Sequence, residues 1–316
     1  MKRLTLIATA LLLCLSFTAC NVVEDVEDLS TSSSSSSDLP AYTYTYDRYA
    51  VPAAVQTSLG SSYETYKAAV DAIDGAAESF VVADEAEYEA VCEALEACYP
   101  PYGLVTGASY DAASKEVRLS YRYNANVMQQ QIEKMDQLSG MIMALALREG
   151  DDELNRALAL YHYVITSIHM DGSDSSLWVG FMDGTGGSYA AAAMYSFLLT
   201  QVDVESVLAV TTDHENKDHY LVIVTLDGKP YIMDPAYELE FSKGGLVCFG
   251  TTEQEITANR LAIPVKALFG QTPACTDARF ADMRQCAKWS FNEDRTRVSM
   301  TVDGSTQIFD LTEESN

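Results

Sequence analysis

Three side chains in the central part of the chain have the types and spacing of a nucleophilic site. Ser188 follows two glycines and precedes an alanine-rich stretch that predicts a helix from Tyr189 to Leu199. His219 heads an apolar, β-branched run, and Asp234 follows the next such run. A hydroxyl at a helix N-terminus, a histidine and an aspartate can serve as nucleophile, base and orienting group in acyl transfer. Ser188, His219 and Asp234 are therefore the candidate catalytic residues.

The spacing of these residues resembles that of the transglutaminase-like superfamily. Its papain-type core has an acyl-transferring Cys at the start of a helix, a His on one strand and an Asp after the next. Ser188 takes the Cys position, because Leu198-Leu199 and Asp203-Val204 then match a Leu pair and the Gly-Ile that precedes a strand. An alternative register places Gly186 there and misplaces the Leu pair.

Other segments extend the resemblance over most of residues 85–280. The resemblance implies an α+β fold in which the nucleophile-position helix packs on an antiparallel sheet, with Trp178 and Tyr220 as candidate cleft residues. The remaining matches are His219-Tyr220-Leu221 for His-Ala-Trp, Leu226 to Tyr231 for Leu-Asp-Gly-x-Trp-Tyr, Leu160 to Val164 with Asp171 for a lipoprotein-type helix, and Tyr99 to Tyr102 for a Tyr-Pro-Glu-Phe corner.

Ser188 is the main departure from the family pattern. A cysteine thiol has a pKa near 8.5 that a helix N-terminus and an imidazolium lower, whereas a serine hydroxyl must lose its proton to a base during attack. Tyr161 and His162 also replace the family's His-Asp pair, and Tyr220 replaces the residue after its His. Several changes in one block are typical of a site that has lost its chemistry.

Each candidate residue also has a structural interpretation. Ser188 is a favourable helix N-cap, His219 can be retained for a structural bond to Asp234, and Asp234 before a proline can be a turn residue. The other three histidines, His162, His169 and His214, are interpreted as solvent or core residues. No remaining cysteine precedes an alanine-rich helix.

The N-terminus has the organisation of a secretory signal. Met1-Lys2-Arg3 is followed by an apolar run from Leu4 to Leu15, and Ala19-Cys20 resembles a bacterial lipoprotein box with Cys20 as the lipidation site. The alternative is a plain signal peptide. The acidic, Ser-rich residues 21–40 predict a flexible spacer. We expect a lipid-anchored protein on the extracytoplasmic face of a bacterial cell membrane.

Charge and cysteine content limit the partners and cofactors. The formal net charge of -26 opposes long-range attraction to phosphate backbones, which argues against a nucleic-acid partner. The cysteines beyond Cys20 are odd in number and show no zinc-type spacing, so we expect at most two disulfides, no metal and no cofactor. They are Cys92, Cys98, Cys248, Cys275 and Cys286.

Hydrophobic periodicity predicts the elements that position the site. Helices are expected over 62–100, 124–147 and 151–168, where the Met residues of the second helix face the core. Strands are expected over 117–123, 206–210, 220–226 and 229–233, with hairpins at Asp227-Gly228 and Asp303-Gly304. The expected organisation is a signal peptide (1–19), an anchor and linker (20–40), a helical and strand extension (41–130) and a transglutaminase-like domain (131–316).

Two functional hypotheses follow from these features. The leading one is a cell-surface pseudoenzyme that binds a peptide or cell-wall-derived amide, or serves a structural role as a spacer. The alternative is a serine-dependent amidase, esterase or acyl transferase that uses Ser188, His219 and Asp234.

Overall fold

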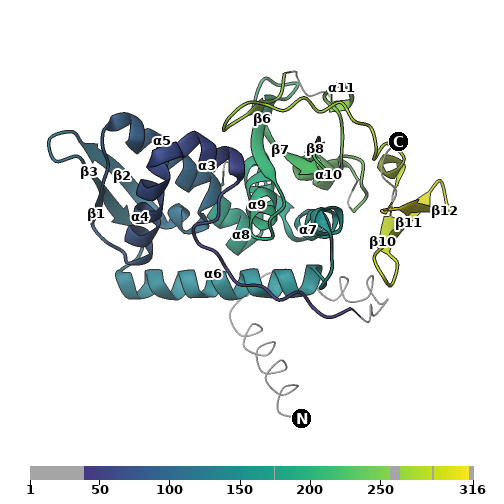
Figure 1. Cartoon of the computed structure of the whole chain (residues 1–316), viewed down its shortest axis with the longest axis horizontal. Coiled ribbons are helices and arrows are strands. Elements are labelled where there is room, and N and C mark those ends of the chain that lie inside the picture. Colours follow the sequence, from purple (N-terminus) through teal and green to yellow (C-terminus); the bar gives the residue numbers. More distant parts are fainter. Residues whose placement is uncertain (1–38, 174, 243, 257–263, 287, 313–316) are drawn as a thin grey trace, which may run out of the picture. The chain divides into compact units, whose positions relative to one another are not determined.

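The computed structural model describes residues 39–312, except 174, 243, 257–263 and 287. The signal segment, Cys20 and most of the linker thus lie outside the described residues. Within the described part, helices and antiparallel sheets alternate around a continuous hydrophobic core, so the fold class is α+β (Figure 1). No helix of this part has the length and apolar character needed to cross a membrane.

A four-stranded antiparallel sheet in the order β8-β7-β6-β9 carries two of the candidate residues. Its strands are β6 (Ser206–Thr212), β7 (Asp218–Leu226), β8 (Lys229–Met233) and β9 (Lys266–Ala267). Asp227 and Gly228 join β7 to β8 with φ values of 52° and 73°, which is the positive-φ pair of a tight hairpin turn. The hairpin predicted from Asp-Gly is confirmed.

Helix α9 (Ser188–Thr200) packs on this sheet against β6 and β7. All residues from Ala190 to Leu199 are buried, because the helix is also covered by α7 (Glu153–Ser167), α8 (Leu177–Asp183) and α10 (Pro235–Phe241). A helix that is apolar all round belongs inside a protein. The arrangement of a helix on an antiparallel sheet agrees with the expectation.

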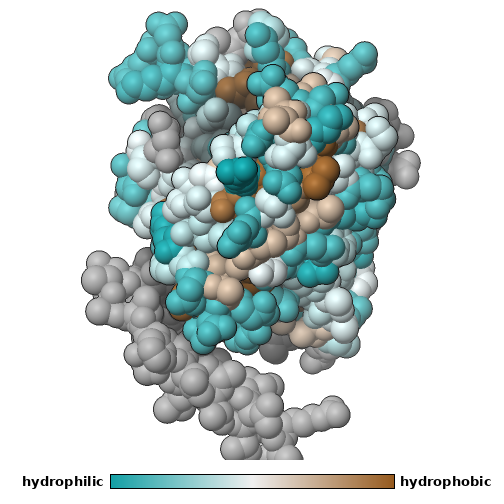
Figure 2. Space-filling view, turned by 90° about the vertical axis from the view of Figure 1, so that its left-hand side faces the viewer, coloured by the Kyte–Doolittle hydropathy of each residue, from teal (hydrophilic) through white to brown (hydrophobic). Residues whose placement is uncertain are grey.

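The part before α6 contains a second sheet as well as helices. This part comprises the described residues before Ala125; its antiparallel strands lie in the order β1-β3-β2, and Figure 2, which views the molecule from this side, shows a largely hydrophilic surface with scattered hydrophobic residues. The elements are α3 (Ala53–Leu59), η1 (Gly60–Ser62), α4 (Tyr63–Asp74), β1 (Ser79–Val81), α5 (Glu85–Cys98), η2 (Pro100–Leu104), β2 (Val105–Asp111) and β3 (Glu116–Tyr121).

The helical character predicted over 62–100 is wrong between α4 and α5, where the chain forms β1. The chain leaves α4 at Gly75, and Ala76 adopts a φ of 47°, a conformation that an α-helix does not contain. Phe80 then pairs with Val117 of β3, so the strand is fixed by a partner far along the chain. Asp84 begins α5 by accepting a hydrogen bond from the Glu87 amide at 3.0 Å.

Helix α6 (Ala125–Ala146) confirms the long helix predicted there. Asn124 caps it by accepting a hydrogen bond from the Val127 amide at 3.1 Å. The Met stripe is mostly core, since Met128, Met135 and Met143 are buried while Met141 is 42% exposed. The boundary expected between residues 130 and 131 falls inside this helix.

A third sheet, β10-β11-β12, lies at the C-terminal end. Its strands are β10 (Lys288–Phe291), β11 (Arg297–Val302) and β12 (Ser305–Asp310). The predicted hairpin at Asp303-Gly304 is confirmed, and β10 is an additional strand. Arg295, in the turn before β11, forms an ion pair of 2.5 Å with Asp151, and both side chains are nearly buried. This pair fastens the sheet to the start of α7.

The remaining elements are short. They are β4 (His169–Met170), β5 (Thr185–Gly186), α11 (Glu253–Ile256) and η4 (Met283–Gln285).

Residues 40–47, which we call the strap, lie against the ends of α6 and α9. The Glu149 amide donates to the Pro40 carbonyl at 2.9 Å, and the Thr43 amide donates to the Glu149 carboxylate at 2.7 Å. Gln201, at the end of α9, accepts from the Tyr44 hydroxyl at 2.8 Å and donates to the Asp47 carbonyl at 2.9 Å. The strap therefore connects the C-terminal ends of α6 and α9 through hydrogen bonds to Glu149 and Gln201.

Candidate functional site

His219 and Asp234 form a buried pair. The distance from His219 Nε2 to Asp234 Oδ2 is 2.8 Å, and the side chains are 11% and 3% exposed. Because β7 and β8 pair Val222 with Met233, the residue after β8 lies beside the start of β7. Asp234 Oδ1 also accepts a hydrogen bond from the Tyr237 amide at 3.0 Å, which caps α10 and fixes the carboxylate.

Ser188 lies against the same end of β7. It is the first residue of α9, and its Oγ accepts a hydrogen bond from the Tyr220 amide at 3.2 Å. Since Tyr220 follows His219, the three residues singled out from the sequence are gathered in one place. The hydrogen bonds of the described residues do not include one from the Ser188 hydroxyl to the His219 ring.

The structure does not give Ser188 the capping role considered for it. The N-cap of α9 is Gly187, and no side chain caps this helix within the described part of the chain. The Ser188 hydroxyl bonds across to β7 instead of to its own helix. Its contact is therefore tertiary, and it ties the start of α9 to the strand that carries His219.

Two glycines shape the approach to Ser188. Gly186 has a φ of 150°, and a Cβ there would lie 2.2 Å from Ser175 Oγ and 2.5 Å from the Ala190 methyl. A Cβ on Gly187 would lie 2.7 Å from the Ser173 carbonyl oxygen. The segment after β4 therefore packs directly on this backbone. Gly186 is buried and leaves no room for a side chain, which favours the register with Ser188 at the nucleophile position.

The electrostatics of the pair favour a charged imidazole. Burial of the His219 ring disfavours the charged form, but the charge and hydrogen bond of Asp234 more than offset this. Asp213 and Glu240 act in the same direction, so the pKa of His219 lies above its usual value of about 6.5. An imidazolium pairs with a thiolate, whereas a serine hydroxyl needs a neutral imidazole to accept its proton.

Tyrosines surround the candidate site. Tyr220 meets Tyr189 edge to face, with ring centroids 5.0 Å apart, and Tyr237 meets the His219 ring edge to face at 5.6 Å. Tyr220 is partly exposed. Trp178 is only 5% exposed, and a Cβ on Gly103 would lie 2.5 Å from its Cβ. Its ring is therefore packed in the core and does not line an open cleft.

The other three histidines form no hydrogen bond to the Asp234 carboxylate in the described part of the chain. His162 is packed edge to face on Trp289 with centroids 5.0 Å apart, and burial lowers its pKa. His169 and His214 are exposed. The five cysteines between residues 39 and 312 form no disulfide, and the residues that the structure describes contain no group of His, Cys, Asp and Glu able to hold a metal ion.

A buried polar cluster behind Asp234 was not expected from the sequence. Glu238 is fully buried, and its carboxylate accepts from the Cys248 amide at 2.6 Å and from the Tyr161 hydroxyl at 3.1 Å. The same hydroxyl lies 3.1 Å from the Asp234 carbonyl oxygen. Nothing in the sequence around Glu238 distinguishes it from an ordinary surface carboxylate. The sequence therefore does not indicate this cluster.

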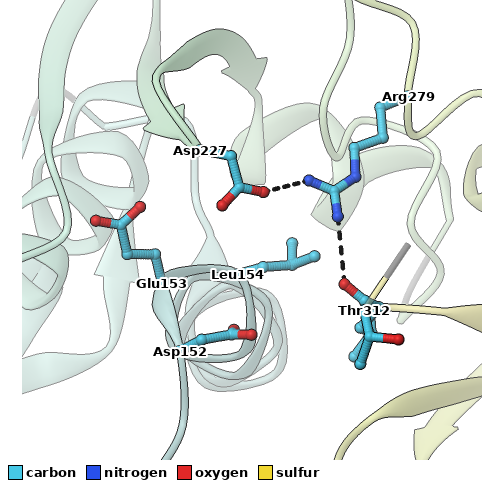
Figure 3. A pocket seen from close by; sticks show the side chains of 7 residues that line it. Asp152, Glu153, Leu154, Asp227, Arg279 and Thr312 are labelled. Carbon is cyan, nitrogen blue, oxygen red and sulfur yellow. Dashed lines mark hydrogen bonds and ion pairs between the residues drawn. The ribbon is translucent and has the colours of Figure 1, made fainter. Parts of the chain in front are cut away.

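A separate cavity of about 370 Å³ lies near the start of α7 (Figure 3). Asp227 faces Arg279 across it, at 2.5 Å, and the Asp152 and Glu153 side chains come from the start of α7. Its other lining residues are Leu154, Leu311 and Thr312. None of these residues belongs to the site around Ser188.

No protein-family model matches the sequence, and no curated protein matches it. The solved structures that are similar to part of the chain include the following three. The "putative cysteine protease" from Cytophaga hutchinsonii is 10% identical, with a TM-score of 0.30 over 45% of this chain and 55% of its own. A TGase structure is 14% identical, with a TM-score of 0.29 over 36% of this chain and 34% of its own. The "putative protease" from Parabacteroides distasonis is 11% identical, with a TM-score of 0.28 over 53% of this chain and 34% of its own. The chain thus spans 55%, 34% and 34% of the length of these cysteine protease-type and transglutaminase-type neighbours.

Proposed function

We propose that this protein is a transglutaminase-like pseudoenzyme that binds a peptide or cell-wall-derived amide at the site around Ser188. One observation carries the proposal. The Ser188 hydroxyl, at the nucleophile position, accepts a hydrogen bond from the Tyr220 amide, while the His219 ring is paired with Asp234. The residues that would activate a thiol are retained, but the side chain present is a hydroxyl that has no hydrogen bond to the His219 ring among the described residues.

The pair of His219 and Asp234 suits a thiol nucleophile. A general base must be neutral to accept a proton, and its pKa is best placed near the working pH. Asp234 raises the pKa of His219, which reduces the neutral fraction. A serine hydroxyl gains nothing from an adjacent imidazolium in its ground state, since it does not ionise as a thiol does.

The geometry also supports binding. The start of α9, the backbone of β7 and the rings of Tyr189, Tyr220 and Tyr237 present polar and aromatic groups together. Tyrosine combines a broad apolar face with a hydroxyl, which suits recognition of peptide-like ligands. We therefore assign the role of an amide-binding surface to these residues.

The experiment is a comparison of the wild type with Ser188→Ala and Ser188→Cys. A fluorophosphonate probe and activated esters should give no Ser188-dependent labelling or turnover, and Ser188→Ala should match the wild type. Ser188→Cys should gain a thiol of low pKa that reacts with iodoacetamide below pH 8.5. Peptide mapping distinguishes this thiol from the native cysteines. Labelling of the wild type that vanishes in Ser188→Ala contradicts the pseudoenzyme.

The second candidate function is a serine-dependent amidase, esterase or acyl transferase. The observation that favours it is the intact pair of His219 and Asp234, which a hydrolase uses to orient its base. Ser188-dependent labelling with a pH profile that follows the titration of His219 is the result that establishes this alternative.

We further propose that Cys20 is lipidated and holds the protein on the outer face of a bacterial cell membrane. The support is the sequence alone, namely an apolar run followed by Ala19-Cys20 and an acidic, Ser-rich segment. Metabolic labelling with a fatty-acid analogue tests it. Label should be present in the wild type and absent in Cys20→Ser, and release of the unaltered wild type into the medium contradicts the anchor.

A further inference from the structure

Glu238 is a buried carboxylate that accepts several hydrogen bonds. It is fully buried and accepts from the Cys248 amide at 2.6 Å, the Val247 amide at 3.1 Å, the Tyr161 hydroxyl at 3.1 Å and the Ser242 hydroxyl. A carboxylate offers about four acceptor positions, and the single Tyr161 proton at one of them is shared with the Asp234 carbonyl oxygen. Burial raises the pKa of Glu238, and the donors counter part of this effect.

Tyr161 joins this carboxylate to the backbone of Asp234. Its hydroxyl lies 3.1 Å from Glu238 Oε2 and 3.1 Å from the Asp234 carbonyl oxygen. The Tyr161 ring is fully buried between Tyr195 and Phe249, which it meets edge to face at 5.4 and 5.3 Å. The hydroxyl is thus held in place by α7 and reaches the first turn of α10.

The orientation of the Asp234 carboxylate depends on this part of the backbone. The Asp234 amide donates to the Cys248 carbonyl at 3.1 Å, while the Cys248 amide donates to Glu238. The backbone of Asp234 is therefore held at its amide by Cys248 and at its carbonyl by Tyr161. Both of these residues also donate hydrogen bonds to Glu238. The same residue then presents one oxygen to Tyr237 and the other to His219.

We propose that Tyr161 and Glu238 are positioning residues of the candidate site, which hold the backbone at Asp234 so that its carboxylate meets His219. This inference goes beyond the proposed function, since it applies whether the site binds a ligand or performs chemistry. Neither residue touches His219 itself; they act through Asp234.

The test measures the pKa of His219 by NMR in the full-length protein. Only four histidines are present, so their imidazole signals can be assigned with single substitutions. Tyr161→Phe keeps the ring and removes the hydroxyl. We expect the pKa of His219 to fall by about one pH unit, which Coulomb's law gives when two charges separate from about 3 to about 4 Å at an effective dielectric of about 20. Glu238→Gln should produce a shift of the same sign.

The matched control for the tyrosine is Tyr195→Phe. Tyr195 is fully buried and donates to the Ala157 carbonyl at 2.9 Å, so this variant loses one buried hydrogen bond of α7 without touching Asp234. The control for the carboxylate is Glu255→Gln, whose side chain accepts from Thr252 and pairs with Arg284. Neither control should move the His219 titration.

A second readout uses Ser188→Cys as background. Addition of Tyr161→Phe should raise the thiol pKa at position 188, measured from the pH dependence of alkylation. If the His219 titration in Tyr161→Phe matches that in Tyr195→Phe, the positioning role is overturned. This outcome is independent of fluorophosphonate labelling, which alone decides between the pseudoenzyme and the hydrolase.

Discussion

Replacement of Asp234 by Asn should reverse the direction in which His219 is perturbed. The substitution removes the charge 2.8 Å from His219 Nε2 and retains an oxygen that can accept from the Tyr237 amide. The local backbone cap should therefore survive. Burial of the ring remains and is the largest effect acting on His219, so its pKa should fall from above the ordinary value to below about 6.5.

The magnitude follows from the separation of the charges. At about 3 Å and an effective dielectric of about 20, the gross attraction is about 5 kcal/mol. Desolvation of the two groups cancels part of this attraction. An opposite charge in direct contact typically changes a pKa by about 1 to 3 units, or roughly 1.4 to 4 kcal/mol. We expect the His219 shift in Asp234→Asn to lie in this range.

The same substitution should change how stability depends on pH. In the wild type the pKa of His219 is raised by folding, so its contribution is fully present below about pH 6.5 and is lost as the pH rises through the folded-state pKa. In Asp234→Asn the folded-state pKa lies below the unfolded one. The contribution of His219 is then lost as the pH falls below about 6.5.

NMR titration and urea denaturation between pH 5 and 9 measure both effects. The control is Glu240→Gln, which removes an exposed charge that also raises the pKa of His219 but makes no direct contact with the ring. Its shift should be much smaller. If Asp234→Asn leaves the pKa of His219 above 6.5, the account of the pair as an ion pair is refuted.

Three further predictions concern stability. Asp151→Asn removes the charge paired with the nearly buried Arg295 and should lower the free energy of unfolding by about 3 to 5 kcal/mol in urea titrations; a loss below about 1 kcal/mol contradicts this. Gly186→Ala places a Cβ into two neighbours and should be more destabilising than Gly228→Ala, which has open space and only the cost of a positive φ; equal thermal unfolding midpoints contradict this. Burial lowers the pKa of His162, so the free energy of unfolding should fall less steeply below about pH 6.5 in His162→Leu than in the wild type. An unchanged pH dependence of the free energy of unfolding in this range contradicts this.

Local signals in the sequence account for the elements that were predicted correctly. The long periodic pattern that became α6 and the Asp-Gly turn between β7 and β8 each depend on residues close together in the chain. Strand β1 was missed because its three residues are defined by pairing with β3, with Phe80 opposite Val117. Short strands of this kind have no periodicity that a sequence can display.

In the candidate site, too, some features could be predicted from the sequence and others depend on contacts between distant segments. The spacing of Ser188, His219 and Asp234, through its resemblance to the transglutaminase-like pattern, predicted that the three residues lie together. The partner of the Ser188 hydroxyl is a backbone amide, which has no side-chain signature in the sequence. Tyr161 and Glu238 are separated by 77 residues, and neither segment indicates the other, so only the folded arrangement relates them.

The strap determines how the folded body resists a pulling force on its N-terminal side. Tension applied at residue 39 meets first the bonds of Pro40 and Thr43 to Glu149, and then those of Tyr44 and Asp47 to Gln201. These contacts follow one another along the strap, so they are loaded in sequence and peel apart at lower force than a set loaded together. Ser188 lies at the opposite end of α9 from Gln201. We expect the strap to detach from Glu149 and Gln201 before a force on residue 39 acts on the site around Ser188.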